Sequence, residues 1–162
     1  MRLSSLADYA VLMMRTAATH CGGARANAAS LAVEAGIPVP TGQKLASLLG
    51  RAGLIKATRG SGGGIKLARP AAAITLADII EAVDGPIALT GCLEPHGADC
   101  CALAQPCELR PHWIGVNALV RDALAHVTLA HLIASPETLP VAAFAAPGLT
   151  GPASATAMES VQ

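Results

Sequence analysis

Aromatic side chains are scarce in this chain of 162 residues, whose only examples are Tyr9, Trp113 and Phe144. The hydrophobic fraction of 52% includes 35 alanines, so it overstates the side-chain volume available for a core. A large core would have to be built from Leu, Ile and Val. The composition therefore limits the fold to one small helical domain with a further helical element.

Long apolar runs are also missing. No stretch approaches the roughly eighteen apolar residues of a membrane span. Residues 1–10 contain Arg2, Ser4, Ser5 and Asp8 where a signal peptide would be continuously apolar. We therefore expect a cytoplasmic protein with reduced thiols, because disulfide frameworks belong mainly to secreted chains.

Acidic residues are nearly absent from the first part of the chain. Residues 1–70 carry nine of the eleven basic groups but only Asp8 and Glu34, which gives a net charge of +7. Residues 71–162 carry nine acids against Arg110 and Arg121, a net charge of −7. This asymmetry is typical of a chain that binds a polyanion with one half. A basic face that only aids solubility is the alternative.

Three helical patterns occupy the basic half. Ser5 is expected to cap the first helix, which ends near Gly22. The inward face of that helix is expected to be Leu6, Tyr9, Ala10, Met13 and Ala17. A short second helix is expected over residues 28–35, and a third runs from Pro40 to about Ala52. Two helices joined by a tight turn that contains glycine form a helix-turn-helix.

Two short alternating segments, residues 54–58 and 65–68, follow the third helix and predict a β-hairpin. A helix-turn-helix followed by a basic hairpin is a winged helix. Gly62 and Gly63 in the turn would let the backbone approach DNA closely, and Arg59 can enter a narrow minor groove. A nucleotide phosphate loop is the alternative, but no helix follows the glycines directly and the Walker lysine and hydroxyl are missing.

Direct contacts with DNA bases are expected from the start of the third helix. Thr41, Gln43 and Lys44 are the exposed polar candidates there. Gln43 can read the edge of an adenine, and Lys44 can contact a guanine or a phosphate.

Four of the five cysteines, Cys92, Cys100, Cys101 and Cys107, lie within sixteen residues on a stretch without apolar periodicity. Thiolates on such a loop suit zinc or an iron-sulphur cluster. Zinc bound by all four is disfavoured, because adjacent cysteines rarely share one ion and the Cys-x2-Cys spacing is absent. A thiol redox switch centred on Cys100 and Cys101 stays open.

A long helix is expected from Pro111 to about Val127. Apolar residues recur along it at steps of four and three, the spacing of a helix-to-helix seam. They are Leu109, Trp113, Val116, Val120, Ala123 and Val127. So small a domain cannot cover this stripe and its apolar flanks, so the helix predicts a homodimer. Residues 128–133 should add a turn or two, and the proline-containing residues 135–162 are expected to be disordered.

Several separated motifs agree in order and spacing with one known family. They are Met1-Arg2-Leu3, Asp8-Tyr9-Ala10, Arg51-Ala52-Gly53-Leu54, Arg59-Gly60-x-Gly62-Gly63-Gly64, Leu67-Ala68-Arg69-Pro70 and Leu76-Ala77-Asp78-Ile79-Ile80. From Met1 to about Ile133 the chain resembles the Rrf2 family of bacterial winged-helix regulators, whose members include IscR, NsrR and RirA. Residues 85–92 and 107–113 resemble most the regulators of the SUF iron-sulphur assembly operon.

The resemblance implies a homodimeric repressor of cluster assembly genes that binds a palindromic operator in double-stranded DNA and carries a two-iron or four-iron cluster. The family uses three cysteine ligands, and Cys92, Cys101 and Cys107 match its spacing best, with Cys100 as the alternative to Cys101. NsrR-like members use an aspartate at the position of Asp8, which reaches across the dimer. IscR-like members have a histidine ligand at the position that Arg110 occupies here. His96 and His112 are therefore the histidine candidates for the fourth ligand of the cluster.

The expected fold is mainly α with a small β-hairpin. We expect a winged helix-turn-helix over residues 1–84, a cluster-binding loop over 85–108, a dimerisation helix with a final turn over 109–134, and a tail over 135–162. A regulator that uses zinc or a thiol switch on the same frame is the alternative function. An enzyme is least favoured, because no nucleophile, acid-base pair or open metal site can be assembled.

Overall fold

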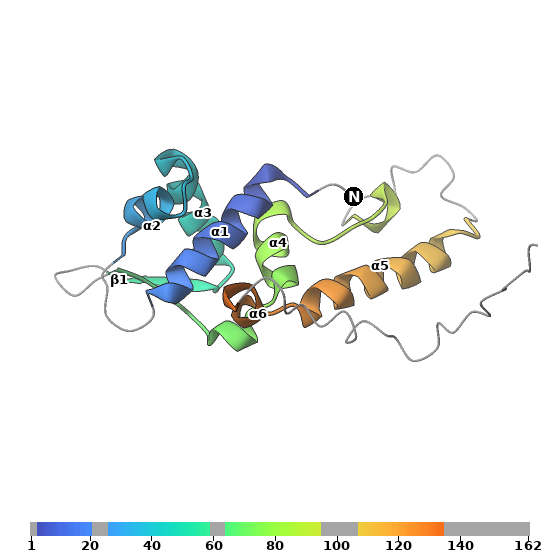
Figure 1. Ribbon diagram of the computed structural model, residues 1–162. Helices are drawn as coiled ribbons and strands as arrows, with labels where there is room; N and C mark the ends of the chain where they lie inside the picture. Colours follow the sequence, from blue (N-terminus) through green and yellow to red (C-terminus); the bar gives the residue numbers. More distant parts are fainter. Residues whose placement is uncertain (1–2, 21–25, 59–63, 95–106, 135–162) are drawn as a thin grey trace, which may run out of the picture.

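The structure is a computed structural model and describes residues 3–20, 26–58, 64–94 and 107–134. In chain order its elements are α1 (Ser5–Thr19), α2 (Ala28–Glu34), α3 (Val39–Arg51), β1 (Ile55–Thr58), β2 (Gly64–Leu67), η1 (Ala71–Ala73), α4 (Leu76–Asp84), η2 (Gly91–Leu93), α5 (Arg110–His126) and α6 (Leu129–Ile133). Figure 1 shows α1 to α4 gathered in one body with the hairpin at one end, while α5 extends away from it. The mainly helical fold with a small hairpin confirms the predicted fold class.

Aliphatic side chains and methionines fill the core of this body. The largest fully buried side chains are Met13, Met14, Leu31, Leu45, Leu49, Leu54, Ile74, Ile79, Ile80 and Leu129. Each stabilises the fold by about 1.5–3 kcal/mol relative to an exposed position. The expectation of a core of Leu, Ile and Val is right for Leu and Ile. Methionines of α1 take the place expected of valine, since Val127 is the valine buried among the described residues.

The start of α1 lies one residue earlier than the sequence predicts. Ser4 is the N-cap: its hydroxyl accepts a hydrogen bond of 3.1 Å from the Ala7 N–H and donates one of 2.6 Å to Asp84 at the end of α4. Ser5 is therefore the first helical residue, and the predicted capping by Ser5 is wrong. Asp8, placed one turn into the helix, is not part of a capping box.

A close approach between α2 and α3 sets the geometry of the helix-turn-helix. Gly36 ends the α2 segment with a φ of +69°, a conformation that favours glycine. Gly42 of α3 is buried, and a Cβ built on it would lie 2.4 Å from the Cβ of Ala32. A larger residue at position 42 would push the two helices apart. Helix α3 begins at Val39 rather than at the expected Pro40, with Pro38 as its N-cap.

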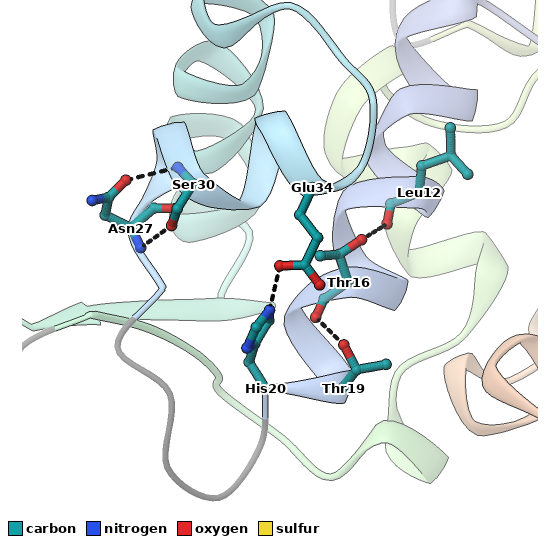
Figure 2. Close-up of polar contacts among 7 residues, drawn as sticks. All are labelled: Leu12, Thr16, Thr19, His20, Asn27, Ser30 and Glu34. Carbon is teal, nitrogen blue, oxygen red and sulfur yellow. Dashed lines mark hydrogen bonds and ion pairs between the residues drawn. The ribbon is translucent and has the colours of Figure 1, made fainter.

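Polar contacts fix α2 at both of its ends (Figure 2). At its start, Asn27 and Ser30 form a reciprocal capping box, with both hydrogen bonds at 2.9 Å. At its end, the Glu34 carboxylate lies 2.6 Å from Nε2 of His20, which follows the last turn of α1. The first helix and the helix-turn-helix are thus joined by side chains as well as by the core.

The hairpin forms where the sequence predicts it, with bounds shifted by one residue. β1 and β2 pair antiparallel in the register Ile55 with Leu67, Lys56 with Lys66, Ala57 with Ile65 and Thr58 with Gly64. Ile55 and Ile65 are buried, so one face of the hairpin packs on the core. A backbone hydrogen bond of 2.8 Å from Ile65 to Ala26 fixes the hairpin to the body, and one of 2.9 Å from Ala68 to Leu54 extends the pairing of the two strands.

Backbone pairing attaches the far end of α5 to the body. The Leu76 N–H donates to the Val127 carbonyl and the Leu129 N–H donates to the Ile74 carbonyl, both at 2.7 Å. Val127 is consequently buried against its own chain, and its predicted place in a dimer seam is wrong. In the part of the chain that the structure describes, no helix is long and apolar enough to cross a membrane.

Candidate DNA interface and cysteine site

The outer face of α3 is polar and follows helical spacing. Its exposed residues are Pro40, Gln43, Lys44, Ser47, Gly50 and Arg51. Leu45 and Leu49 hold the opposite face in the core, which fixes the direction of this stripe. Of the residues predicted to contact bases, Gln43 and Lys44 are exposed and Thr41 is half-buried. Ser47 and Arg51, four and eight residues after Gln43, extend the same face; their spacing was visible in the sequence but was not used.

A pair of lysines covers the outer face of the hairpin. Lys56 and Lys66 are exposed and directly opposite each other across the two strands, so their ammonium groups extend from the same side. Like charges placed opposite each other destabilise a hairpin slightly, unless an anion lies between them. The sequence analysis missed this pair because register cannot be read from either strand alone. Arg59, Gly62 and Gly63, the predicted contacts of the turn, lie outside the described residues.

The described basic groups on these two surfaces form no ion pair with any acidic residue that the structure describes. Among the described residues, the ion pairs join His20 to Glu34, Arg69 to Asp78 and Arg121 to Glu81. None of them involves Lys44, Arg51, Lys56 or Lys66. These four positive charges are therefore available to an external polyanion, which is the arrangement that DNA phosphates require.

Two of the predicted cysteine ligands lie within the described residues. Cys92 is on η2 and Cys107 lies three residues before α5, and both thiols are free and half-buried. The sulphur of Cys92 is 3.2 Å from the Thr90 hydroxyl, a hydrogen bond in which either atom could be the donor. Cys100, Cys101 and His96 fall in the stretch 95–106, outside the described residues. Within the described part of the chain, no three His, Cys, Asp or Glu side chains gather into a metal-binding group.

The segment before Cys92 is fixed on two sides. Ile87 is buried in a small cluster with Ala7 of α1 and Ala77 and Ile80 of α4. On its other side the segment is bonded to Asn117 of α5, which accepts from the Leu89 N–H and donates to the Ile87 carbonyl, each at 2.9 Å. The cysteine segment therefore joins the first turn of α1, the helix α4 and the helix α5.

Asp8 is exposed in the first turn of α1, next to Ala7. In the described parts of the chain its carboxylate forms no side-chain hydrogen bond or ion pair, so it is free to act as a ligand. His112 is exposed near the start of α5. Soft thiolates with one carboxylate suit iron in a sulphide cluster, so the donor types present fit such a cofactor.

Helix α5 exposes a large apolar surface. Leu109, Trp113, Ile114, Val116 and Leu119 are between 40% and 64% exposed. The contacts of α5 with its own chain are made by Asn117, which bonds the cysteine segment, by Arg121, which bonds Glu81, and by Leu124, which packs on the small cluster around Ile87. The hydrogen bonds to Glu81, together with its charge, raise the pKa of Arg121, so this attachment stays ionised. These apolar side chains of α5 are left exposed in the part of the chain that the structure describes.

Comparisons with known proteins agree on one family. The family model described as Rrf2, iron-dependent transcriptional regulator, matches residues 3–135. The HTH-type transcriptional regulator IscR of Erwinia tasmaniensis is 33% identical over 142 residues, which cover 88% of this chain and 84% of that protein. The structure of T. potens IscR is 28% identical with a TM-score of 0.60, covering 82% of this chain and 86% of that one. The oxidised form of CymR from Staphylococcus aureus is 28% identical with a TM-score of 0.62, covering 85% and 100%.

Proposed function

This chain belongs to the Rrf2 family of transcriptional regulators, and from that membership we propose that it senses an iron-sulphur cluster and represses genes of the SUF type. The observation that carries the proposal is the pair of free, half-buried thiols, Cys92 and Cys107, which flank the loop with two further cysteines. A regulator of cluster supply must respond to whether a cluster is present. Cysteines joined to a DNA-binding body provide that response.

The DNA contacts that we propose follow the two basic surfaces. Helix α3 would enter the major groove, with Thr41, Gln43 and Lys44 nearest to the bases. The hairpin would lie along the adjacent minor groove, with Arg59 entering it while Gly62 and Gly63 allow close approach. Lys56 and Lys66 would hold phosphates on the outer face of the hairpin. DNA binding places such a regulator in the bacterial cytoplasm.

A homodimer follows from the uncovered stripe on α5. Exposed apolar side chains at a spacing of four and three are stable in water when a second helix covers them. Two copies of α5 would place two α3 helices on the same side of the DNA. The operator is then expected to be an imperfect palindrome, because the two-fold symmetry of the protein is repeated in the DNA.

The ligands that we propose for the cluster are Cys92, Cys101, Cys107 and Asp8, with Cys100 as the alternative to Cys101. When bound, a cluster supplies iron-thiolate bonds that oxygen or iron limitation breaks. Asp8 lies one turn into the helix that also carries Ala7, and Ala7 contacts the cysteine segment through Ile87. Release of Asp8 and Cys92 would therefore change the contacts of α1, the first helix of the DNA-binding body.

A thiol or zinc switch on the same frame is the second candidate. It is favoured by the similarity to the oxidised form of CymR, a regulator whose oxidised state was crystallised. Adjacent cysteines at positions 100 and 101 provide thiols for such chemistry. In that reading Cys92 and Cys107 would bind zinc or remain reduced.

Anaerobic purification separates the two functions. The full chain is purified without oxygen, and its visible absorption spectrum, iron content and acid-labile sulphide content are measured. The cluster proposal predicts iron and sulphide in comparable amounts and a broad absorption band that disappears in air. Zinc without sulphide, or a colourless protein that stays free of iron after anaerobic reconstitution, would refute it.

A further inference from the structure

The backbone just before Cys92 is held by a single side chain of α5. Asn117 accepts a hydrogen bond from the Leu89 N–H through Oδ1 and donates one to the Ile87 carbonyl through Nδ2, both at 2.9 Å. The Ile87 carbonyl and the Leu89 N–H therefore both face α5, and the chain bends at Leu89 and Thr90 directly after them. The amide of Asn117 binds both backbone groups at once.

Asparagine is the residue that this arrangement requires. Its amide offers one acceptor and two donors, and the orientation seen here satisfies both backbone groups. An aspartate could still accept from Leu89 but could not donate to Ile87, and a leucine could do neither. Both hydrogen bonds are partly buried, so a lost partner leaves backbone groups that water reaches poorly.

A continuous path leads from this amide to the sulphur of Cys92. Leu89 precedes Thr90, and the Thr90 hydroxyl lies 3.2 Å from the Cys92 sulphur. On the opposite side, burial of Ile87 against Ala7 and Ile80 prevents the segment from moving away from α5. Contacts between α5 and η2, the short helix that carries Cys92, continue this attachment.

We propose that Asn117 is the positioning residue for Cys92, because it holds the backbone before Cys92 at a fixed position relative to α5. A change at Cys92 that moves its backbone would have to break or shift these two hydrogen bonds. The movement would therefore be transmitted to α5. Conversely, a second protein chain that packs on α5 would restrict the movement of Cys92. The positioning role concerns this chain alone, whereas its use in sensing rests on the cluster function proposed above.

The test uses the full-length, cluster-free protein and the variants Asn117→Leu and Asn117→Asp. Each is treated briefly with iodoacetamide, and peptide mass spectrometry gives the alkylation of Cys92 relative to Cys107. Cys107 is the internal reference because it is outside the clamped segment. Since two hydrogen bonds are lost, we expect the Cys92 to Cys107 ratio to rise about five-fold or more in Asn117→Leu and by less in Asn117→Asp. Exchange of the Leu89 amide hydrogen should accelerate in parallel.

Arg121→Met is the matched control, because it removes another attachment of α5 while leaving Asn117 in place. It should lower the melting temperature without changing the ratio. An unchanged ratio in Asn117→Leu would overturn the proposal, as would an equal rise in Arg121→Met. If Asn117→Leu fails to fold, Asn117→Asp decides by the same readout.

The same variants, loaded with iron and sulphide, extend the test to sensing. Cluster absorbance in the presence of an iron chelator should decay at least about five-fold faster in Asn117→Leu than in wild type. A wild-type chain that never assembles a cluster would refute the proposed function but leave the alkylation result valid. A cluster that decays equally fast in both proteins would refute the role of Asn117 in holding its ligand.

Discussion

The body formed by α1 to α4, the hairpin and α6 shares one buried core, whereas the arm formed by residues 85–94 and 107–126 leaves a large apolar surface exposed. In the body the described large apolar side chains are buried or half-buried, except for Leu3, Leu12, Val33 and Ile133, and the exposed faces of α3 and the hairpin are polar or basic. In the arm no residue of α5 is buried, and five large apolar residues are exposed. The body supplies the basic surfaces that we propose for DNA, while the arm supplies the apolar surface and the thiols that we propose for a second chain and a cluster.

Loss of a cysteine should have the largest effect, because the arm then lacks a ligand. Cys92→Ala or Cys107→Ala should abolish cluster absorbance, while Cys100→Ala should retain most of it. The measurement is the visible spectrum after anaerobic reconstitution, with circular dichroism to confirm that the helices persist. An essential Cys100 with a dispensable Cys101 would show that the ligand assignment is wrong.

A charge on the apolar stripe of α5 should separate the dimer. Val116→Asp would place a carboxylate in a dry helix-to-helix seam, and we expect dimer dissociation to become at least about 100-fold more favourable. Ala118→Asp introduces the same group at an exposed position off the stripe and should leave the dimer intact. Sedimentation equilibrium measures both. A Val116→Asp protein that stays dimeric would locate the interface elsewhere.

Neutralising the hairpin lysines should weaken DNA binding by a moderate and salt-dependent amount. Lys56→Gln or Lys66→Gln should each reduce the log-log slope of affinity against salt by about 0.9 per protomer, or about 1.8 for the proposed dimer, since one phosphate contact is lost from each protomer. Either change should also stabilise the free protein slightly, because the two lysines face each other. Arg69→Gln is the control, since Arg69 already pairs with Asp78 at 3.5 Å. Fluorescence anisotropy at several salt concentrations gives the slopes, and an unchanged slope in both lysine variants would remove the hairpin face from the interface.

The smallest effect is expected at the junction of body and arm, where two neighbouring positions have different roles. Ser4→Ala should destabilise the fold by about 1–2 kcal/mol, because it removes both the helix cap and the bond to Asp84. Asp8→Ala should change stability by less than about 0.5 kcal/mol, since Asp8 is exposed and outside the cap. Urea denaturation measures both. An Asp8→Ala cluster with an unchanged spectrum and lifetime would exclude Asp8 as a ligand.

Sequence patterns predicted most of the body, because its elements are set by local signals. The turn glycines and apolar spacing predicted α2, α3 and the hairpin to within one residue, whereas α1 ends at Thr19, three residues before the predicted Gly22. The cap of α1 was misplaced because both Ser4 and Ser5 can cap, and the deciding partner, Asp84, is eighty residues away. The pairing of Lys56 with Lys66 was also missed, because it depends on how the two strands align and neither strand shows this alignment by itself.

Long-range contacts explain what was missed in the arm. Val127 fitted the apolar spacing of α5, but its carbonyl pairs with Leu76 and the residue is buried in its own chain. No sequence motif marks Asn117, because its hydrogen-bond partners are backbone groups of a segment 28 to 30 residues earlier. The cysteine ligands were proposed from family spacing, and they stay a prediction because the loop 95–106 lies outside the described residues.

The most direct test of a cluster-sensing regulator compares DNA binding by one preparation before and after its cluster is removed. The full-length protein is reconstituted without oxygen, and its affinity for the promoter of SUF-type genes is measured by anisotropy with the cluster present and after chelation. The account predicts binding at an imperfect palindrome and an affinity that differs at least about five-fold between the two states, as is typical of coupled sites. Equal affinity in the two states would contradict it.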